Sequence, residues 1–582
     1  MAEASPPGSG RAAALLRLER WLEANHRAVR HNGKVPDDFT DAWRFSLSAG
    51  GERFDLLFLI DGEFPRSKPD IAFVSARPFP SYPHVEADGR ICVLNAIDEI
   101  DPDDPVGVAR HLIQGARNIL EVGLSGRNNE DFRREFLSYW NPAATGPSLL
   151  SILDPSEPSR EIFAWRKGEL RALAESEAAL RTWPVRFLGS EKGRGGRVER
   201  ALLLWLPEPL LPSDYPESPA ALRALAESVG MAATFDRIAG AGNAEMLVVI
   251  GADSENGPCL AGAVVTRSGR NNAIIPGFRK GRAPPNLARG QALHGRLVRS
   301  AVTRADVWWI HGRDSNPDLG DLLMKKVAII GCGSLGSPIA RLLAQAGVGA
   351  LALIDPEKLE WANVGRHALG AESVGHNKAS ELAKRLSRDF PHGRFTDHAV
   401  RWQEAIEEIA QCDLAICAIG SWAQESALSE WQVDALRPPV LYGWTEPHAV
   451  AGHGVVLAAG AGCLRCAMSR FGEANGRVVD WPGPTLQRVP ACGAHFQPYG
   501  APAIAAIAAM IAELAIDQLA YRAMTGAHRI LAGRASTVIA DGGQWSPAWL
   551  ERIGAPRAGG QIEEFQWLPD PACPACGGNG IA

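Results

Sequence analysis

The chain has 582 residues, of which 46% are hydrophobic and 22% charged, and its formal net charge is -6. That length allows about three or four domains, and the balance of residue types excludes a disordered or fibrous chain. The small acidic excess argues against broad binding to nucleic acid or to an anionic membrane.

The N-terminal start, MAEASPPGSG, is polar and lacks the basic and apolar parts of an export signal. No apolar run free of charges is long enough to span a bilayer. We therefore expect a cytoplasmic protein whose ten cysteines stay reduced, able to bind metal or to act as nucleophiles.

Residues 1–150 predict one α+β domain. Apolar residues at helical spacing, short alternating runs and Gly or Pro punctuation mark its elements. In chain order we expect a helix over 11–30, strands of an antiparallel meander at 43–50, 53–60 and 70–76, and helices over 106–124 and up to about Trp140. Cys92 lies between the strands and these later helices.

Residues 151–305 predict an α/β linker domain of unknown role. We expect a helix over 159–183 and strands at 199–208 and 244–252, followed by a stretch rich in Gly, Arg and Pro from 266 to 296. No motif in this range points to a chemistry.

Residues 306–582 predict a Rossmann-like domain, in which helices cover a doubly wound parallel sheet. From residue 325 the pattern runs strand, Gly-rich turn, helix, strand. Gly331, Gly333 and Gly336 form a GxGxxG turn, where the backbone can approach a phosphate and the helix N-terminus favours its charge. The motif predicts a nucleotide but does not choose which one.

Polar and cationic residues follow this turn in an order that suits a nucleoside triphosphate. Asp355 ends the second strand, 19 residues after Gly336, where a carboxylate can hold ribose hydroxyls. Asn363, Arg366 and Lys378 then supply an amide and two cations, which can grip phosphates and stabilise a phosphoryl transition state. A dehydrogenase would match only as far as Asp355.

The C-terminal cysteines predict a metal site with a separate thiol nearby. A closed, tetrahedral set of thiolates suits structural zinc, and two CxxC pairs supply it: Cys463, Cys466, Cys573 and Cys576. Cys492 stands alone between the pairs and is a candidate nucleophile. The remaining cysteines of this half and of the linker are expected in the core: Cys259, Cys332, Cys412 and Cys417.

Residues 321–576 resemble the E1/MoeB/ThiF adenylating superfamily. The resemblance rests on the Gly-rich turn, on GVG at 347–349, on the two CxxC pairs, and on Asp355, Asn363, Arg366 and Lys378. It implies that ATP adenylates the C-terminal glycine carboxylate of a ubiquitin-like or similar partner, with release of pyrophosphate. A thioester on a cysteine follows in that family, and the domains pair as a homodimer.

This sequence has a match for the catalytic cysteine of that superfamily but not for its magnesium ligand. PACGAHFQPYG, at 490–500, looks like the family's catalytic-cysteine segment and implies Cys492. Where the family usually has a magnesium-binding Asp, this chain has Gly420, so Mg²⁺ must be held in another way.

The N-terminal region resembles a ubiquitin-conjugating (E2, or UBC) domain. The matching segments are Phe64-Pro65, Pro69, Tyr82-Pro83-His84 and Gly89-Arg90-Ile91-Cys92-Val93-Leu94. The resemblance implies that Cys92 is a second catalytic thiol. His84 stands where the family has an Asn that stabilises the oxyanion, and an imidazole can also donate to an oxyanion.

A chain with both regions resembles the fused E1-E2 proteins of bacterial antiphage operons, especially those paired with cGAS-like nucleotidyltransferases in CBASS. The implied cycle is adenylation, a thioester on Cys492, transfer to Cys92, and ligation to an amine of an acceptor protein. The implied partner is the C-terminus of a cGAS-like nucleotidyltransferase or of a ubiquitin-like protein. Two alternatives remain open: a nucleotide-dependent oxidoreductase, and a sulfur-carrier activating enzyme whose N-terminal domain only binds protein.

Overall fold

The computed structural model describes residues 9–75, 79–93, 100–126, 128–241, 243–266, 278, 284–433, 437–488, 495–521, 525–554 and 556–577. The chain forms two compact units, Met1–Leu180 with Gly196–Ala305, and Arg181–Gly195 with Asp306–Ala582. Several separate sheets and many helices confirm the predicted α/β multidomain class.

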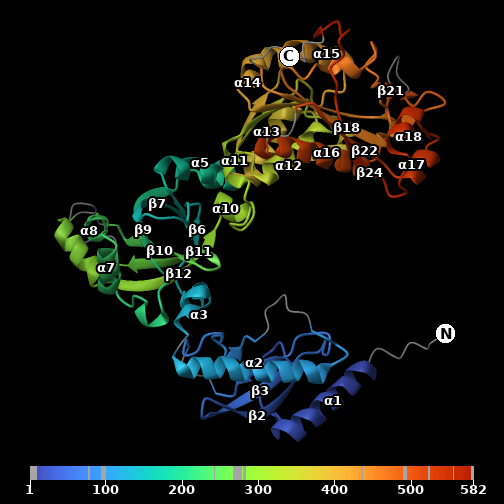
Figure 1. The fold of residues 1–582 in the computed structure, drawn as a ribbon. Coiled ribbons are helices and arrows are strands. Elements are labelled where there is room, and N and C mark those ends of the chain that lie inside the picture. The colour runs from blue at the N-terminus through green and yellow to red at the C-terminus, as the bar shows by residue number, and fades with distance from the viewer. Residues whose placement is uncertain are drawn as a thin grey trace. The chain divides into compact units, whose positions relative to one another are not determined.

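A five-stranded antiparallel sheet, in the order β1-β2-β3-β4-β5, builds the N-terminal region, and helices α1 and α2 pack against it (Figure 1). Leu18 of α1 and Leu112 of α2 share one core with Trp43 and Phe58 of the strands. The helices and meander predicted here are confirmed. The elements are α1 (Ser9–His26), β1 (Val29–Arg30), β2 (Asp41–Ala49), β3 (Glu52–Ile60), β4 (Asp70–Phe73), β5 (Arg90–Ile91), α2 (Pro105–Ser125), α3 (Asn129–Arg134), α4 (Phe136–Trp140) and η1 (Asn141–Ala143).

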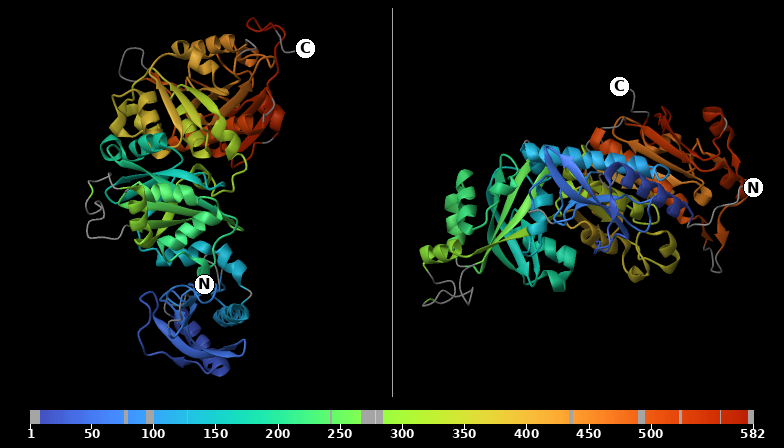
Figure 2. Two further views of the ribbon diagram at one scale, coloured as in Figure 1. Left: turned by 90° about the vertical axis from the view of Figure 1, so that its left-hand side faces the viewer. Right: turned by 90° about the horizontal axis from the view of Figure 1, so that it is seen from below.

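The next strands form a closed barrel in the order β10-β11-β12-β6-β8-β7-β9, with helices α7 and α8 on its outside (Figures 1 and 2). Along β9, Leu203 packs with the residues inside the barrel, whereas Leu202 and Leu204 pack under the helices, as the two-residue period of a strand requires. The elements are β6 (Leu149–Ser151), β7 (Arg160–Lys167), β8 (Leu170–Ala174), β9 (Arg197–Leu206), η2 (Pro212–Asp214), α7 (Pro219–Ser228), α8 (Ala232–Gly240), β10 (Glu245–Ser254), β11 (Gly257–Thr266), α9 (Pro285–Leu293) and β12 (Arg296–Arg304).

The helix predicted over 159–183 is wrong for most of its length. Arg160–Lys167 and Leu170–Ala174 are antiparallel strands, and only α5 (Glu177–Leu188), followed by α6 (Ser190–Gly193), is helical. Ile162 and Leu173 point into the barrel core, and pairing with β9 satisfies the backbone of β7. Tertiary burial therefore overrides the helix-prone composition of this segment.

An eight-stranded sheet, in the order β15-β14-β13-β16-β17-β18-β22-β24, is the centre of the second unit. The strands from β15 to β17 are parallel and the rest are antiparallel, and the predicted strand, turn, helix and strand after residue 325 are β13, α12 and β14. The elements up to the last parallel strand are α10 (Val307–Ile310), α11 (Leu319–Met324), β13 (Lys326–Ile330), α12 (Gly336–Ala346), β14 (Ala350–Ile354), η3 (Trp361–Arg366), η4 (Ala371–Ser373), α13 (Lys378–Asp389), β15 (Arg394–His398), η5 (Trp402–Ala405), α14 (Ile406–Ala410), β16 (Leu414–Cys417), α15 (Trp422–Gln432) and β17 (Val440–Thr445).

The remaining elements complete the antiparallel half of this sheet and its cover. They are η6 (Pro447–Ala449), β18 (Ala451–Leu457), η7 (Leu464–Ala467), β19 (Val479–Asp480), β20 (Gln487–Arg488), β21 (His495–Phe496), α16 (Ala501–Ile516), η8 (Asp517–Tyr521), β22 (Ala527–Ala532), α17 (Ala535–Ala540), β23 (Gln544–Trp545), α18 (Pro547–Ile553) and β24 (Gln561–Gln566).

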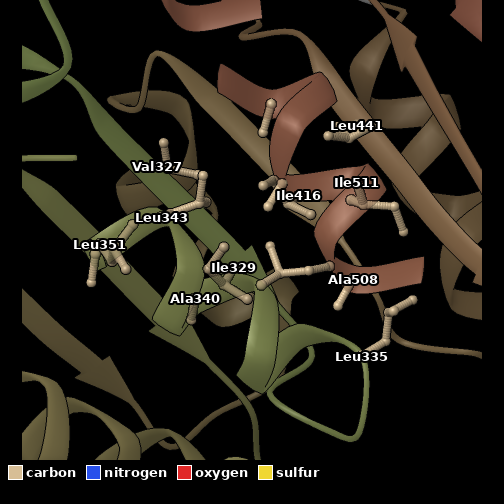
Figure 3. Packing of buried hydrophobic residues seen from close by; sticks show 14 of the residues in the cluster. Val327, Ile329, Leu335, Ala340, Leu343, Leu351, Ile416, Leu441, Ala508 and Ile511 are labelled. Atoms are coloured by element: carbon tan, nitrogen blue, oxygen red, sulfur yellow. The ribbon is translucent and has the colours of Figure 1, made fainter. Parts of the chain in front are cut away.

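Helices α12 and α16 lie together over one face of this sheet (Figure 3). Leu343 of α12 and Ile511 of α16 meet Ile329 and Ile416 of the central strands. Within the described residues, the stretch Ala501–Ala520 is the one helix long and apolar enough to cross a membrane, and half of its apolar window is buried in this unit. Its buried residues belong to the core just described.

We predict that Gly349→Ala destabilises the second unit by about 1–3 kcal/mol, because it overpacks a site where two backbone segments approach closely. A Cβ at position 349 would lie 1.8 Å from the backbone carbonyl oxygen of Leu323. Hydrogen exchange of the β13 and β14 amides in the full chain measures the loss. Gly370→Ala is the control, since a Cβ there meets nothing within 4 Å. Equal amide protection in the two variants would contradict the close approach.

Candidate functional site

The Gly-rich turn between β13 and α12 needs its glycines for two different reasons. Gly331 has φ of 90°, and a Cβ there would lie 2.6 Å from the carbonyl oxygen of Ala418. A Cβ on Gly336 would lie 1.8 Å from the carbonyl oxygen of Gly331. At Gly333 a Cβ would meet nothing within 4 Å. Two glycines therefore shape the turn, and the third leaves open space beside the backbone, where a phosphate can approach.

Asp355, at the end of β14, fixes this turn. Its two carboxylate oxygens accept the backbone N–H groups of Cys332, at 2.7 Å, and of Glu357, at 2.8 Å. The residue is only 5% exposed, and burial raises the pKa of its carboxyl group against the opposing effect of these two bonds. A carboxylate oxygen has a second lone pair, so Asp355 can still accept a hydroxyl.

The predicted cations and amide follow β14, with Asn363 and Arg366 in η3 and Lys378 at the start of α13. The Lys378 ammonium lies 2.6 Å from a carboxylate oxygen of Glu357, and its remaining donors can bind a further anion. Arg366 donates to the carbonyl of Ala362 at 2.9 Å. The Asn363 side-chain oxygen accepts the N–H of Glu360 at 3.1 Å, which shapes the η3 turn.

Tyr499 connects three parts of the site, and the sequence analysis missed it. Its hydroxyl is 2.9 Å from the Ser334 hydroxyl in the Gly-rich turn, and the Arg366 guanidinium lies 5.2 Å from the centre of its ring. Tyr499 also lies near the end of the segment 490–500, which carries Cys492; Cys492 itself lies outside the described residues. The nucleotide turn, a cation and the thiol segment therefore meet at one phenol.

Gly420, predicted to replace a magnesium-binding Asp, lies close to another carboxylate. Its N–H donates to a Glu425 side-chain oxygen at 2.9 Å, and burial raises the pKa of Glu425. Glu425 carries no local sequence signal for this role, because it stands five residues further on, in the first turn of α15.

Cys92 and His84, the second pair of predicted residues, line one pocket of about 490 Å³. The backbone N–H of Cys92 donates to the His84 carbonyl at 2.7 Å, so the two residues are held side by side. Cys92 is half-buried, and burial raises the pKa of its thiol. This thiol is therefore protonated at neutral pH.

His84 is held by two residues that the sequence analysis missed, Glu135 and Tyr139. The imidazole Nδ1 lies 3.2 Å from a Glu135 carboxylate oxygen, and the His84 backbone N–H donates to the Tyr139 hydroxyl at 2.9 Å. That hydroxyl in turn donates to the other oxygen of Glu135 at 3.0 Å. The contact with Glu135 raises the pKa of His84 and lowers that of Glu135. The pocket can therefore hold a charged imidazole beside a thiol.

The four predicted metal ligands come together in one buried cluster. Their sulfur atoms all lie within 4.8 Å of one another, with separations of 3.6 Å between Cys463 and Cys573 and 3.4 Å between Cys466 and Cys576. Thiolates about 2.3 Å from a shared zinc ion lie about 3.8 Å apart, so the donor set fits. Burial and the neighbouring sulfurs raise the pKa of Cys463, which disfavours its thiolate. The four cysteines can therefore all be deprotonated only if a cation lies among them.

We predict that Cys573→Ser removes the bound metal and loosens the C-terminal segment, because one of four soft ligands is lost. Metal content by mass spectrometry and limited proteolysis of the purified chain measure both effects. Cys412→Ser is the control: Cys412 is also buried, but its thiol donates to the Glu408 carbonyl at 3.3 Å and lies outside the cluster. Retention of one zinc per chain in Cys573→Ser would refute the assignment.

Two family models match the chain. Residues 313–538 match the ThiF family, and residues 17–146 match prokaryotic E2 family B. The first range contains the Gly-rich turn, Asp355 and both cations. The second contains Cys92, His84 and Glu135.

Several bacterial proteins are similar to this chain in sequence. The ATP-dependent ubiquitin transferase-like protein Cap2 of Pseudomonas aeruginosa is 25% identical over 459 residues, 75% of this chain and 79% of that protein. The Vibrio cholerae protein of the same name is 27% identical over 243 residues, 40% of this chain and 41% of that protein. A crystal structure of E. coli MccB with ATP gives a TM-score of 0.32 at 18% identity, covering 44% of this chain and 68% of that chain. The chain thus joins a prokaryotic E2 family B domain to an E1-like domain of the ThiF family.

Proposed function

We propose that this protein is an ATP-dependent ubiquitin transferase-like enzyme that activates the C-terminus of a partner protein and ligates it to an amine. The observation that carries the proposal is the fusion of a ThiF-family domain, with an intact Gly-rich turn, to an E2-family domain whose cysteine lines a pocket. The two bacterial relatives that bear this name support it.

In the first step, the Gly-rich turn receives the phosphates of ATP and Asp355 the ribose. A carboxylate oxygen of the partner's C-terminal glycine attacks the α-phosphorus, and pyrophosphate leaves. Arg366 and Lys378 stabilise the negative charge that spreads over the phosphate oxygens. Magnesium neutralises phosphate charge when it is bound, and Glu425 beside Gly420 offers the carboxylate that position 420 lacks.

In the following steps the acyl group passes through two thiols. The Cys492 sulfur attacks the acyl-adenylate and AMP leaves, which gives a thioester. The Cys92 sulfur then attacks this thioester, and Cys492 leaves as the thiol. An amine of the acceptor protein attacks the Cys92 thioester, forming an amide and freeing Cys92, while His84 donates to the oxyanion.

The setting of the proposed reaction follows from the resemblance to antiphage proteins. We place the enzyme in the bacterial cytoplasm, as a homodimer, acting in CBASS on the C-terminus of a cGAS-like nucleotidyltransferase or of a ubiquitin-like protein. A sulfur-carrier activating enzyme with a non-catalytic N-terminal domain is the second candidate. The pocket that Cys92 and His84 line, with Glu135 against the imidazole, favours the first.

We predict that Arg366→Ala and Asp355→Ala each lower ATP–pyrophosphate exchange at least about 100-fold, since one removes a phosphate cation and the other a ribose contact that also fixes the turn. The assay uses the partner protein or a peptide of its C-terminus. Arg385→Ala is the matched control, because Arg385 pairs with Asp389 on the exposed side of α13. Normal exchange in Arg366→Ala would remove this residue from the nucleotide site.

We predict that the two thiols act in a fixed order. Cys492→Ala should still exchange pyrophosphate but carry no thioester anywhere, because Cys92 has no donor. Cys92→Ala should accumulate a reducible adduct on Cys492 and form no amide product. Gels with and without thiol reductant, run with ATP and the partner, separate these species. A Cys92→Ala variant that still conjugates its target would overturn the E2 role and favour the sulfur-carrier alternative.

A further inference from the structure

The pocket around Cys92 contains a set of polar groups that bind one another. Glu135 follows α3 and Tyr139 lies in α4, and both bind His84 on the loop before Cys92. Each of the two Glu135 oxygens has its own partner, the imidazole Nδ1 and the Tyr139 hydroxyl. Both oxygens of Glu135 are thus engaged, in a pocket that also contains the Cys92 thiol. This arrangement indicates that Glu135 has a role in the chemistry of the pocket.

We propose that Glu135 is a positioning residue that holds His84 as an imidazolium, so that Nε2–H donates to the oxyanion when an amine attacks the thioester on Cys92. This inference rests on the proposed function and deepens it, because it assigns a role to a residue outside the E2 signature segments. It also chooses between two roles for His84, a hydrogen-bond donor and a proton acceptor.

The backbone conformation of His84 is fixed partly by contacts from outside its own loop. Its φ of 57° is unusual for a residue with a side chain. The N–H is held by Tyr139 and the carbonyl by the N–H of Cys92, at 2.9 and 2.7 Å. Strain of this kind persists where surrounding contacts over-determine it, and it gathers at functional sites.

The charges around the imidazole favour its protonated form. Glu135 and Asp131 raise the pKa of His84, whereas burial and Arg134 lower it, and the raising effects prevail. From its own loop, Glu86 and Asp88 line the same pocket. Glu135 occupies Nδ1, and no described residue forms a hydrogen bond with Nε2. An imidazolium held this way has one N–H left to donate.

The step balances without any further reactant. The amine nitrogen bonds to the thioester carbonyl carbon, and the carbonyl oxygen becomes an oxyanion that accepts Nε2–H. The C–S bond then breaks, the amide forms, and the proton released by the amine ends on the Cys92 sulfur. His84 keeps its proton throughout, so this role predicts activity that falls as pH rises through the pKa of His84.

The test loads Cys92 directly, in full-length protein carrying Cys492→Ala. A short synthetic peptide ending in glycine as an alkyl thioester exchanges onto Cys92, and the excess is removed. Hydroxylamine, whose amine is almost entirely unprotonated over the range used, then discharges the adduct, and intact mass follows the rate from about pH 7 to 9. Because ATP and Cys492 are bypassed, this result is independent of whether the adenylation proposal holds.

Glu135→Gln should slow discharge about ten-fold at neutral pH and move the fall at high pH down by about one pH unit. Glu135→Asp should restore part of both, and Tyr139→Phe, which changes no charge, should slow discharge with a smaller shift. Glu130→Gln is the matched control, because Glu130 pairs with Arg133 on the same helix and lies outside the pocket.

Two results would overturn the inference. The first is an identical pH profile in the wild-type protein and in Glu135→Gln. The second is a wild-type rate that rises with pH over this range, which would mean that His84 accepts a proton instead of donating a hydrogen bond. If Glu135→Gln unfolds, as seen by circular dichroism, Tyr139→Phe and Glu135→Asp decide between the same outcomes.

Discussion

The Gly-rich turn of the second unit depends on one buried carboxylate. Each oxygen of Asp355 accepts a backbone N–H, and the residue is only 5% exposed. A charged group this deep is tolerated where such bonds replace water. The bonds tie the turn after β13 to the end of β14, so that the positive φ of Gly331 is kept and Gly333 faces open space. Arg366 in η3 and Lys378 at the start of α13 come from later elements, and in the proposed reaction they act on a phosphate only when this turn is fixed.

In the pocket of Cys92, polar side chains likewise fix the backbone, here on a loop instead of at a strand end. His84 has no regular element to hold it, and its backbone conformation is one that a side chain disfavours. Tyr139 and Glu135, from the helical segment after α2, supply the bonds that the loop lacks. In both sites, therefore, polar side chains distant in the sequence fix the backbone conformation of a loop. That loop in turn positions the groups proposed to react.

Features with a local signal were predictable from the sequence, and features made by distant pairs were not. The meander strands, the Gly-rich turn and the CxxC pairs carry their own spacing. Tyr139 is 55 residues from His84, and Tyr499 is 165 residues from Ser334, so nothing in the sequence joins them. The helix predicted over 159–183 was wrong for the same reason, because pairing with β9 and burial in the barrel determine the structure of this segment.

Polar contacts hold the described chain on both sides of Cys492. On one side, Glu446 accepts the N–H groups of Val478 and Val479 and also binds the fully buried His453. On the other side, Tyr499 binds the Gly-rich turn through Ser334. Cys492 stands seven positions before Tyr499, and seven steps of fully extended chain span at most about 25 Å. In the proposed cycle, the contact between Tyr499 and Ser334 therefore ties the described end of the thiol segment to the nucleotide turn.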